Sequence, residues 1–480
     1  MAEYLSPGVY AESVNNANAP IEAVSASTGG FVGISVRGVL NTPTLVTSWQ
    51  NFLDTFAYGM ETPFLVNSDL AYSVYGFFQN GGTKCYIIRT AHSTAAKAEG
   101  ELKESSTTKA TLSAKDEGTW GNKLKVSVTA NADVVANFDL TVKYDGEVVE
   151  KFTNVSNTAS DENYWLDAIV NSKFISCNTG TLVATASDVA FANGADGISD
   201  ITDSDFTSAL ELFDSVDDVN LICVPGQVSE AMTTAILSYA ENRGNVFAII
   251  DGAKSADVNT IKTFRKSLSC KNGALYYPWI KVSDPLSKTG KLRDCPTCGH
   301  IMGIYARTIQ ERGVWKAPAG TEATVKGAVE VVKLLVKSDC DVLNPVGVNV
   351  VMPRANYGIV VWGARSMSPD TTMRYVSDVL LETNIKESIK NGTQWAVFEP
   401  NNSVLWTRVK TAIEAFLDGL WREGGLFGDK AEQAYFVKCD EDLNPESVRN
   451  AGKLICEVGY APNKPAEFVI IRIAHSISNE

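Results

Sequence analysis

The sequence is poor in the residues and motifs that most enzymes use for proton transfer and phosphate binding. Only three histidines, His92, His300 and His475, occur among its 480 residues. The chain has no nucleophile elbow and no plausible catalytic triad. Glycines lie at the start of residues 28–35, but no Gly-Lys-Ser/Thr follows them, so a phosphate loop is missing. We therefore predict no catalytic residues, no cofactor and no metal, and keep a cytoplasmic α/β enzyme as an alternative hypothesis.

A basic charge balance and long apolar runs are also missing. The formal net charge is −14 at pH 7, whereas a general nucleic-acid binder needs a basic patch that displaces counterions. No run of about 18 apolar residues offers a membrane span, and the chain does not start with the basic and then apolar pattern of a signal peptide. We expect a protein made in the cytoplasm, with no direct nucleic-acid contact and no membrane insertion.

The nine cysteines follow no regular spacing, which favours reduced thiols over a disulfide framework. Only the sequence Cys-Pro-Thr-Cys-Gly-His at 295–300 looks like metal or redox chemistry. A structural zinc needs four ligands, and no second cysteine pair follows. A redox pair is expected at a helix N-terminus after a strand, but this pair follows the polar residues 284–293. We predict a loop here, with adventitious metal binding or thiol exchange as the alternatives.

Apolar strands that alternate with amphipathic helices dominate what the chain does contain. The patterns predict strands over 28–35, 85–89, 220–224 and 245–250, and helices over 48–56, 69–80, 229–242 and 256–268. Fully apolar strands alternating with helices indicate a parallel sheet that is covered on both faces. Asp251 follows a strand at the position where α/β enzymes place ligands. Since no His, Ser or Lys partner is discernible nearby, we interpret it as a cap or turn residue.

The composition changes near residue 93. Short strand patterns follow, and Asp145-Gly146 marks a hairpin turn between strands over 138–144 and 148–152. We predict an inserted, mostly β outer domain over 95–199. It interrupts a discontinuous middle α/β domain formed by 21–94 and 200–340.

The C-terminal residues 341–480 have an α+β pattern. Strands are expected over 346–351 and 358–363, and helices over 374–390 and 403–421. The last stretch predicts a hairpin, because 453–460 alternates in polarity and 467–475 is apolar and β-branched. A lone two-stranded hairpin is marginal in water. Either the rest of this chain or another chain must therefore complete its sheet.

Several short motifs appear in a fixed order. They are Tyr-Leu-Ser-Pro-Gly-Val-Tyr at 4–10, Gly-Val-Trp-Lys-Ala-Pro at 313–318, Trp-Gly-Ala-Arg at 362–365, Trp-Ala-Val-Phe-Glu-Pro-Asn at 395–401, Leu-Trp at 405–406 and Ala-Pro-Asn-Lys-Pro-Ala-Glu-Phe at 461–468. In this order they resemble the contractile tail sheath proteins of myophages and related injection systems. The resemblance is dense over about 310–480 and the first 40 residues, and loose over about 95–200.

The resemblance implies a multidomain α/β and α+β fold, with a C-terminal α+β assembly domain and extended terminal arms. It implies a structural subunit that polymerises as a helix around an inner tail tube and contracts to drive the tube through a target envelope. The implied partners are other copies in stacked six-fold rings, the tube protein, and baseplate and tail terminator proteins. The implied location is a virion or tail-like particle, assembled in bacterial cytoplasm. A passive shell or adhesin protein of the same particle is the remaining alternative.

The resemblance also implies inter-subunit contacts at both chain ends. Residues 1–20 would be an extended arm, and the last stretch a strand arm that joins a neighbour's sheet by β-strand addition. The helix over 403–421 would face the tube, unless its polar side is simply solvated. The implied contact residues are Tyr4, Pro7, Val9 and Tyr10 in the N-terminal arm, Phe468, Val469, Ile470, Ile471 and Ile473 in the C-terminal arm, and Arg408 and Lys410 on the tube-facing helix.

Overall fold

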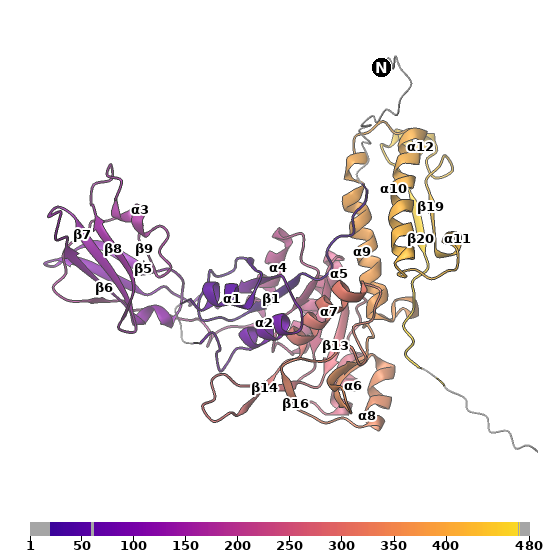
Figure 1. Cartoon of the computed structure of the whole chain (residues 1–480), viewed down its shortest axis with the longest axis horizontal. Coiled ribbons are helices and arrows are strands. Elements are labelled where there is room, and N and C mark those ends of the chain that lie inside the picture. Colours follow the sequence, from indigo (N-terminus) through magenta and orange to yellow (C-terminus); the bar gives the residue numbers. More distant parts are fainter. Residues whose placement is uncertain (1–19, 59–61, 469, 471–480) are drawn as a thin grey trace, which may run out of the picture. The chain divides into compact units, whose positions relative to one another are not determined.

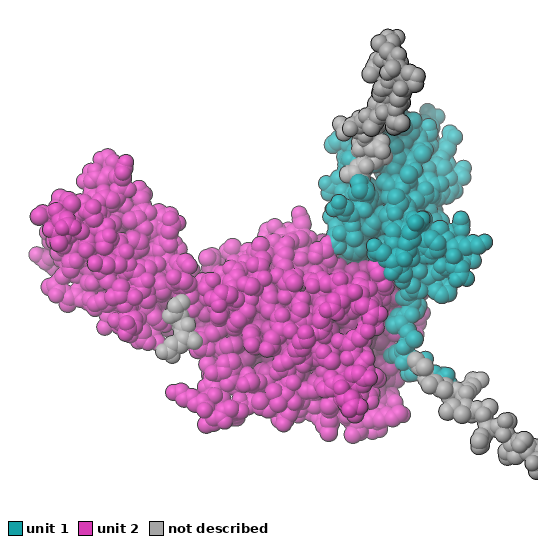
Figure 2. Space-filling view, viewed as in Figure 1, with its two compact units in different colours: residues 1–24, 381–480 teal, residues 25–380 magenta. Residues whose placement is uncertain are grey.

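The computed structural model describes residues 20–58, 62–468 and 470. The chain divides into two compact units (Figures 1 and 2). Unit 1 combines Met1–Val24 with Leu381–Glu480, and unit 2 is Ser25–Leu380. The beginning and the end of the chain therefore belong to the same unit.

Unit 2 is built on an eight-stranded sheet with the order β18-β17-β13-β12-β11-β1-β3-β2. The six inner strands are parallel, and the edge strands β2 and β18 run antiparallel to their neighbours. The predicted strands in this part of the chain correspond to β1, β3, β11 and β12. The strands are β1 (Gly29–Gly33), β2 (Thr44–Val46), β3 (Cys85–Arg89), β11 (Leu221–Cys223), β12 (Phe247–Asp251), β13 (Gly273–Tyr277), β17 (Val348–Arg354) and β18 (Gly358–Trp362).

Helices cover both faces of this sheet, so its strands are apolar on both sides. Phe31 belongs to a buried cluster with residues of α1, α2 and α7, whereas its neighbour Val32 belongs to a second cluster with residues of α4, α5, α6 and α8. The helices are α1 (Trp49–Phe56), α2 (Leu70–Gln79), α4 (Asp203–Glu211), α5 (Glu230–Arg243), α6 (Val258–Lys266), α7 (Cys298–Arg312) and α8 (Lys337–Leu343), with short 3-10 turns η2 (Leu212–Ser215), η3 (Asn344–Val346) and η4 (Thr371–Met373).

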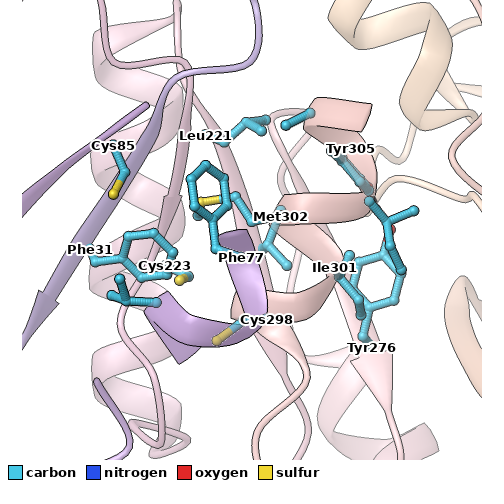
Figure 3. Packing of buried hydrophobic residues seen from close by; sticks show 14 of the residues in the cluster. Phe31, Phe77, Cys85, Leu221, Cys223, Tyr276, Cys298, Ile301, Met302 and Tyr305 are labelled. Atoms are coloured by element: carbon cyan, nitrogen blue, oxygen red, sulfur yellow. Dashed lines mark hydrogen bonds between the residues drawn. The ribbon is translucent and has the colours of Figure 1, made fainter. Parts of the chain in front are cut away.

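Helices α2 and α7 approach each other closely because glycines replace side chains at their contact. A Cβ added to Gly299 would lie 2.3 Å from the carbonyl oxygen of Ser73. A Cβ added to Gly303 would lie 2.4 Å from the carbonyl oxygen of Phe77. Figure 3 shows Phe77 and Met302 beside Phe31 of β1, and the rings of Phe31 and Phe77 meet edge to face at 5.5 Å. This contact fixes both helices against the sheet.

The loop predicted over 295–300 is wrong. Strand β15 (Leu292–Cys295) pairs with β14 (Ile280–Ser283), which also pairs with β16 (Ala328–Val331), and α7 then begins at Cys298. The polar residues before Cys295 had indicated a loop. They form an edge strand instead, since a small three-stranded sheet leaves such a strand partly exposed.

Residues 99–190 form two smaller sheets around a separate core that contains Trp120, Trp165 and Phe174. Asp145 and Gly146, both with positive φ, make the turn between β7 and β8. The sheets have the orders β4-β5-β9 and β10-β6-β7-β8. Their elements are β4 (Glu99–Glu104), β5 (Thr107–Ala114), η1 (Thr119–Lys123), β6 (Leu124–Ala130), β7 (Phe138–Tyr144), β8 (Glu147–Val155), α3 (Trp165–Ile169), β9 (Ile175–Ser176) and β10 (Val189–Ala190).

A buried arginine ties this β region to the rest of unit 2. The guanidinium of Arg37 lies 4.0 Å from the ring centre of Trp120 and 3.6 Å from the carboxylate of Asp116. It also donates hydrogen bonds to the carbonyl oxygens of Tyr58 and Lys173. Burial lowers the pKa of Arg37, while Asp116 raises it. The charge is thus held by a carboxylate, an aromatic face and two carbonyls.

Unit 1 contains most of α9 (Val376–Gly392), η5 (Gln394–Ala396), α10 (Ser403–Arg422), α11 (Ala431–Ala434), β19 (Tyr435–Lys438), α12 (Glu446–Asn450) and β20 (Glu457–Tyr460). Residues 21–24 lie along α9. The Val24 amide donates to Ser388 Oγ at 3.0 Å, and Asn384 donates back to the Val24 carbonyl at 2.9 Å. Ile21 is buried where Gly392 leaves room for it.

The hairpin predicted at the end of the chain is tested only in part, because residues 469 and 471–475 lie outside the described residues. Its first strand corresponds to β20, which pairs antiparallel with the upstream strand β19. Glu467, Phe468 and Ile470 are in no strand. Just after β20, Ala461 and Pro462 pair with residues 427 and 426.

Candidate functional site

Helix α10 is the central element of unit 1. Asn402 begins it, because its side chain accepts from the amides of Val404 and Leu405 at 3.0 and 3.1 Å. Trp406 donates its ring N–H to Asn401 at 2.7 Å, which fixes the preceding loop on the helix. The buried side chains recur at spacings of three and four, as an amphipathic helix requires. They are Leu405, Trp406, Val409, Ile413, Phe416, Leu417 and Leu420.

The two-stranded sheet β19–β20 contacts α10 and has two different faces. Val437 is buried on the side of α10. Phe436, its neighbour, is 53% exposed. The ring of Phe436 covers Gly459 on the opposite strand, since a Cβ added there would lie 2.1 Å from it. One face is thus a core and the other an exposed aromatic surface.

No third strand borders β19–β20 within residues 20–58 and 62–468. An isolated two-stranded sheet is marginal in water, and packing against a helix such as α10 stabilises it. After β20 the chain is held as far as Asn463, whose side chain donates to the carbonyl of Gly424 at 2.7 Å. Beyond this point Phe468 is 71% and Ile470 80% exposed. The described part of the chain thus leaves these two apolar side chains uncovered.

The two cations named for the tube-facing helix lie half-exposed on α10. The Arg408 guanidinium lies 4.6 Å from the ring centre of Trp395. The Lys410 ammonium lies 3.7 Å from Glu414, one turn along the helix. Exposed pairs of this kind contribute only about 0–1 kcal/mol. Of the named arm residues, Tyr4, Pro7, Val9, Tyr10, Val469, Ile471 and Ile473 lie outside the described residues.

Two family models match this sequence. Residues 199–367 match the phage tail sheath protein central domain, and residues 368–475 match the phage tail sheath C-terminal domain. The chain belongs to the phage tail sheath family. The two matched regions together cover more than half of the sequence, and the sheath C-terminal match contains α10 and the β19–β20 sheet.

Individual sheath proteins resemble this sheath chain to different extents. A prophage major tail sheath protein of Pseudomonas aeruginosa (strain UCBPP-PA14) is 26% identical over 52% of this chain and 62% of its own length. The chain thus aligns with less than two thirds of that relative. The fold is similar to that of a chain from the anti-feeding prophage baseplate, with TM-score 0.61 and 23% identity, and the match covers 99% of this chain and 100% of that one. A chain of the PVC extracellular contractile injection system sheath in the contracted state gives TM-score 0.63 at 21% identity, with 99% of each chain covered.

The loop before α10 in this sheath chain carries an exposed aromatic residue that our sequence reasoning did not select. Phe398 is fully exposed, and its φ of 70° is in the left-handed region that non-glycine residues rarely adopt. Val397 beside it is also exposed. The residues lie inside the motif at 395–401, which the sequence analysis had used only to identify the family. A strained, exposed Phe is a natural candidate for a contact with another copy.

Asp251 was the one carboxylate that an enzyme hypothesis for unit 2 had to explain. It is buried, and its Oδ1 accepts from the Thr297 amide and hydroxyl at 2.8 and 2.6 Å and from the Cys298 amide at 3.0 Å. Burial raises its pKa to about 6, while these hydrogen bonds lower it. In the sheath chain this carboxylate caps the N-terminus of α7, which agrees with the cap interpretation.

The region around α7 also contains His300 and two cysteines of the predicted loop. Burial lowers the pKa of His300 to about 4, and its Nδ1 has no partner among the described residues. Burial raises the pKa of Cys295 and Cys298. Within the ranges that the structure describes, no group of three or more His, Cys, Asp or Glu side chains is arranged for a metal ion. In the same ranges no helix combines the length and apolarity of a membrane span.

Proposed function

We propose that this chain is the sheath subunit of a contractile injection particle. In this proposal it polymerises as a helix around an inner tube and contracts to drive the tube through a target envelope. Two facts support it. The chain belongs to the tail sheath family, and its fold matches chains from an anti-feeding prophage baseplate and from a contracted PVC sheath complex along almost their whole lengths.

The two-stranded β19–β20 sheet supports the proposal, since a strand of another copy could extend it. Both chain ends belong to the unit that contains this sheet. An arm of one copy that completes the sheet of the next makes a head-to-tail contact, which closes into rings or extends into helices. Main-chain hydrogen bonds give the affinity of such strand addition, and alternate side chains give its specificity.

The arm residues have separate roles in this proposal. Phe468 and Ile470 are exposed in the single chain and would be buried on a neighbour, together with Val469, Ile471 and Ile473. Each large apolar side chain contributes about 1.5–3 kcal/mol when fully buried. At the other end, Tyr4, Pro7, Val9 and Tyr10 would fill the same role. Several such contacts on each subunit suffice for a stable lattice.

Contraction then re-packs rigid bodies while the arms stay joined. The extended sheath is a kinetic trap in this proposal, and the extra surface buried between subunits drives the change. No nucleotide is needed. The domain limits at 20, 94, 199 and 340 remain predictions. Strands β17 and β18, which those limits assign to the C-terminal domain, belong to the eight-stranded sheet. The β region over 95–199 would face outward, away from the tube.

In this proposal each contact between the sheath subunit and the tube is weak. We assign it to Arg408 and Lys410, whose present partners are Trp395 and Glu414 on the same unit. Exchanging an exposed ion pair for a tube carboxylate is worth about 0–1 kcal/mol for each side chain. A sheath can therefore release its tube, while many repeats hold it beforehand. Baseplate and tail terminator proteins are the further proposed partners, and the particle is the proposed location.

Truncation tests the proposal. Deletion of residues 464–480 should abolish tubular polymers in electron micrographs and leave a folded monomer by circular dichroism. The deletion starts after Asn463, because that residue is bound within its own unit. A Gly/Ser segment of equal length in place of 464–480 is the matched control, and it should also fail to polymerise.

Synthetic peptide 464–480 should block polymerisation of the intact chain in trans. Polymers that form normally without this segment contradict strand addition. Tubes that assemble but never shorten in mild denaturant would favour a passive shell protein.

A further inference from the structure

Two cysteines lie opposite each other at the end of the β19–β20 sheet. The antiparallel register pairs Val437 with Val458 and Lys438 with Glu457. Continuing this register by one residue places Cys439 opposite Cys456. Directly opposite residues of antiparallel strands have Cα atoms about 4.5–5.5 Å apart, and disulfides span Cα separations of about 4.4–6.8 Å.

The side chains of this pair point to the same side. Cys439 is buried and Cys456 half-buried, two residues along from the inward-facing Val437 and Val458. Burial raises the pKa of each thiol, and the nearby Lys410 of α10 lowers it. The register therefore places the two thiols opposite each other on the α10 side of the sheet.

The loop between the two cysteines is already ordered. Asn444, which is fully buried, donates to the carbonyls of Asp440 and Ile455 at 3.0 and 2.9 Å. Its Oδ1 accepts from the Ile455 amide at 2.7 Å. These bonds hold the chain on both sides of the thiols. A bond between the sulfurs would close this loop with little movement of the backbone.

We propose that Cys439 and Cys456 form an oxidation site that closes into a cross-strand disulfide. The oxidant is a small disulfide such as oxidised glutathione. One protein thiolate attacks an oxidant sulfur and expels one glutathione thiolate. The second protein thiolate then attacks the mixed disulfide and expels the other. The protein loses two thiol protons and two electrons, and two molecules of reduced glutathione are formed.

The surroundings of the pair set the rate of oxidation. Burial raises the pKa of Cys456 to about 12, and it also raises the pKa of Cys439. Because only the thiolate reacts, oxidation is slow at neutral pH and becomes faster as the pH rises.

The reducing cytoplasm keeps such thiols reduced. The bond is therefore expected only after the protein meets an oxidising medium. The site does not depend on the proposed function, since both residues and their loop belong to one chain. The disulfide affects only unit 1. It links the two strands and restricts the unfolded chain by closing a loop, which stabilises the fold.

The remaining seven cysteines provide internal controls. Five of them, Cys85, Cys223, Cys270, Cys295 and Cys298, are buried in unit 2, and Cys177 and Cys340 are half-buried there. Cys223 and Cys298 come from a strand of the central sheet and from α7, and both belong to one fully buried cluster. A small oxidant does not reach them while unit 2 is folded.

The test treats the purified full chain with oxidised glutathione at pH 7 and pH 9, then alkylates all remaining thiols under denaturing conditions. We expect seven alkylated cysteines in place of nine, and one linked peptide pair by mass spectrometry that joins Cys439 to Cys456. The reaction should be faster at pH 9. Cys439→Ser and Cys456→Ser should abolish the linked pair, whereas the control Cys177→Ser should leave it intact.

A second measurement follows stability. The oxidised chain should show an unfolding midpoint of unit 1 that is higher by about 5–10 °C, reversed by dithiothreitol. Cleavage within 440–455 by a protease should become slower. Nine alkylated cysteines after prolonged oxidation at pH 9 would overturn the proposal. So would a linked pair between other cysteines, or a glutathione adduct on Cys439 that never resolves.

Discussion

The largest and the smallest sheet of the described residues differ in how fully they are covered. The eight-stranded sheet of unit 2 is buried on both faces under its own helices. The β19–β20 sheet of unit 1 has two strands, one covered face and an exposed Phe436 on the other. Helices of the same chain cover the first sheet. In the proposed assembly, a strand from a neighbouring copy would extend the second.

The largest expected effect comes from a substitution in the helices that cover the eight-stranded sheet of unit 2. Gly299→Val puts a side chain 2.3 Å from the backbone of Ser73, so α2 and α7 cannot keep their distance. We expect a loss of about 4 kcal/mol or more in the free energy of unfolding. Urea denaturation measures it. A near-neutral outcome would mean that the two helices do not depend on glycine for their contact.

Arg37→Ala should have the next largest effect. It removes the cation that Asp116, Trp120 and two carbonyls surround, and it leaves the buried Asp116 without its partner. The expected cost is about 3 kcal/mol. Limited proteolysis near residues 93–97 should become faster, because the β region is then less firmly tied. Arg37→Lys keeps the charge but not the planar stacking, and should recover only part of the loss.

Asp251 and His300 should make the stability of unit 2 depend on pH. The pKa of Asp251 is raised from 3.8 to about 6, so its protonated form stabilises the fold below pH 4 and this gain is lost as the pH rises to 6. The pKa of His300 is lowered from 6.5 to about 4, so its contribution is complete above pH 6.5 and is lost as the pH falls to 4. Each amounts to about 3 kcal/mol, and the two slopes oppose each other.

Single substitutions should reveal each slope in chemical denaturation between pH 4 and 6.5. Asp251→Asn keeps an oxygen at the Oδ1 position for the three hydrogen bonds, and its stability should fall on acidification because only His300 titrates. His300→Leu should instead become more stable as the pH falls. The double variant is the control and should be flat over this range. Identical profiles for both single variants would contradict the opposed slopes.

The smallest expected effect concerns unit 1. Gly419 lies inside α10, and no atom comes within 4 Å of the place where its Cβ would be. Gly419→Ala should therefore stabilise the helix by about 0.5–1 kcal/mol, mainly by restricting the unfolded chain. Thermal unfolding of the monomer measures the gain. Polymerisation should be unchanged, and its loss would place Gly419 in an interface.

The parts of the fold that local patterns determine could be predicted from the sequence. The apolar runs that became β11 and β12, and the stripe of α10, carry their own periodicity. The errors arose where a distant residue decides. Helix α7 begins without a local side-chain cap, since its cap is Asp251, 46 residues away. Strand β20 pairs with β19 across residues 439–456, and four-residue strands contain no signal of their partner.

Some residues of the candidate site could also be named from the sequence, and others could not. Arg408 and Lys410 were named because the family resemblance implies a tube-facing helix, and both lie half-exposed on α10. Their contact with a tube, like the arm contacts, stays a prediction. Phe398 was missed, because the sequence shows only an apolar residue and reveals neither its exposure nor its left-handed backbone. The pairing of Cys439 with Cys456 was missed because it needs the register of β19 and β20.

The hold of Asn463 on Gly424 has a geometric consequence. Because Asn463 is bound to its own unit, the maximum span of the residues after it depends on their number. Each residue inserted or removed just after position 463 changes the maximum span by about 3.3–3.6 Å. A series of such variants would act as a ruler, and the lengths that still permit tubes would report the spacing between neighbouring copies.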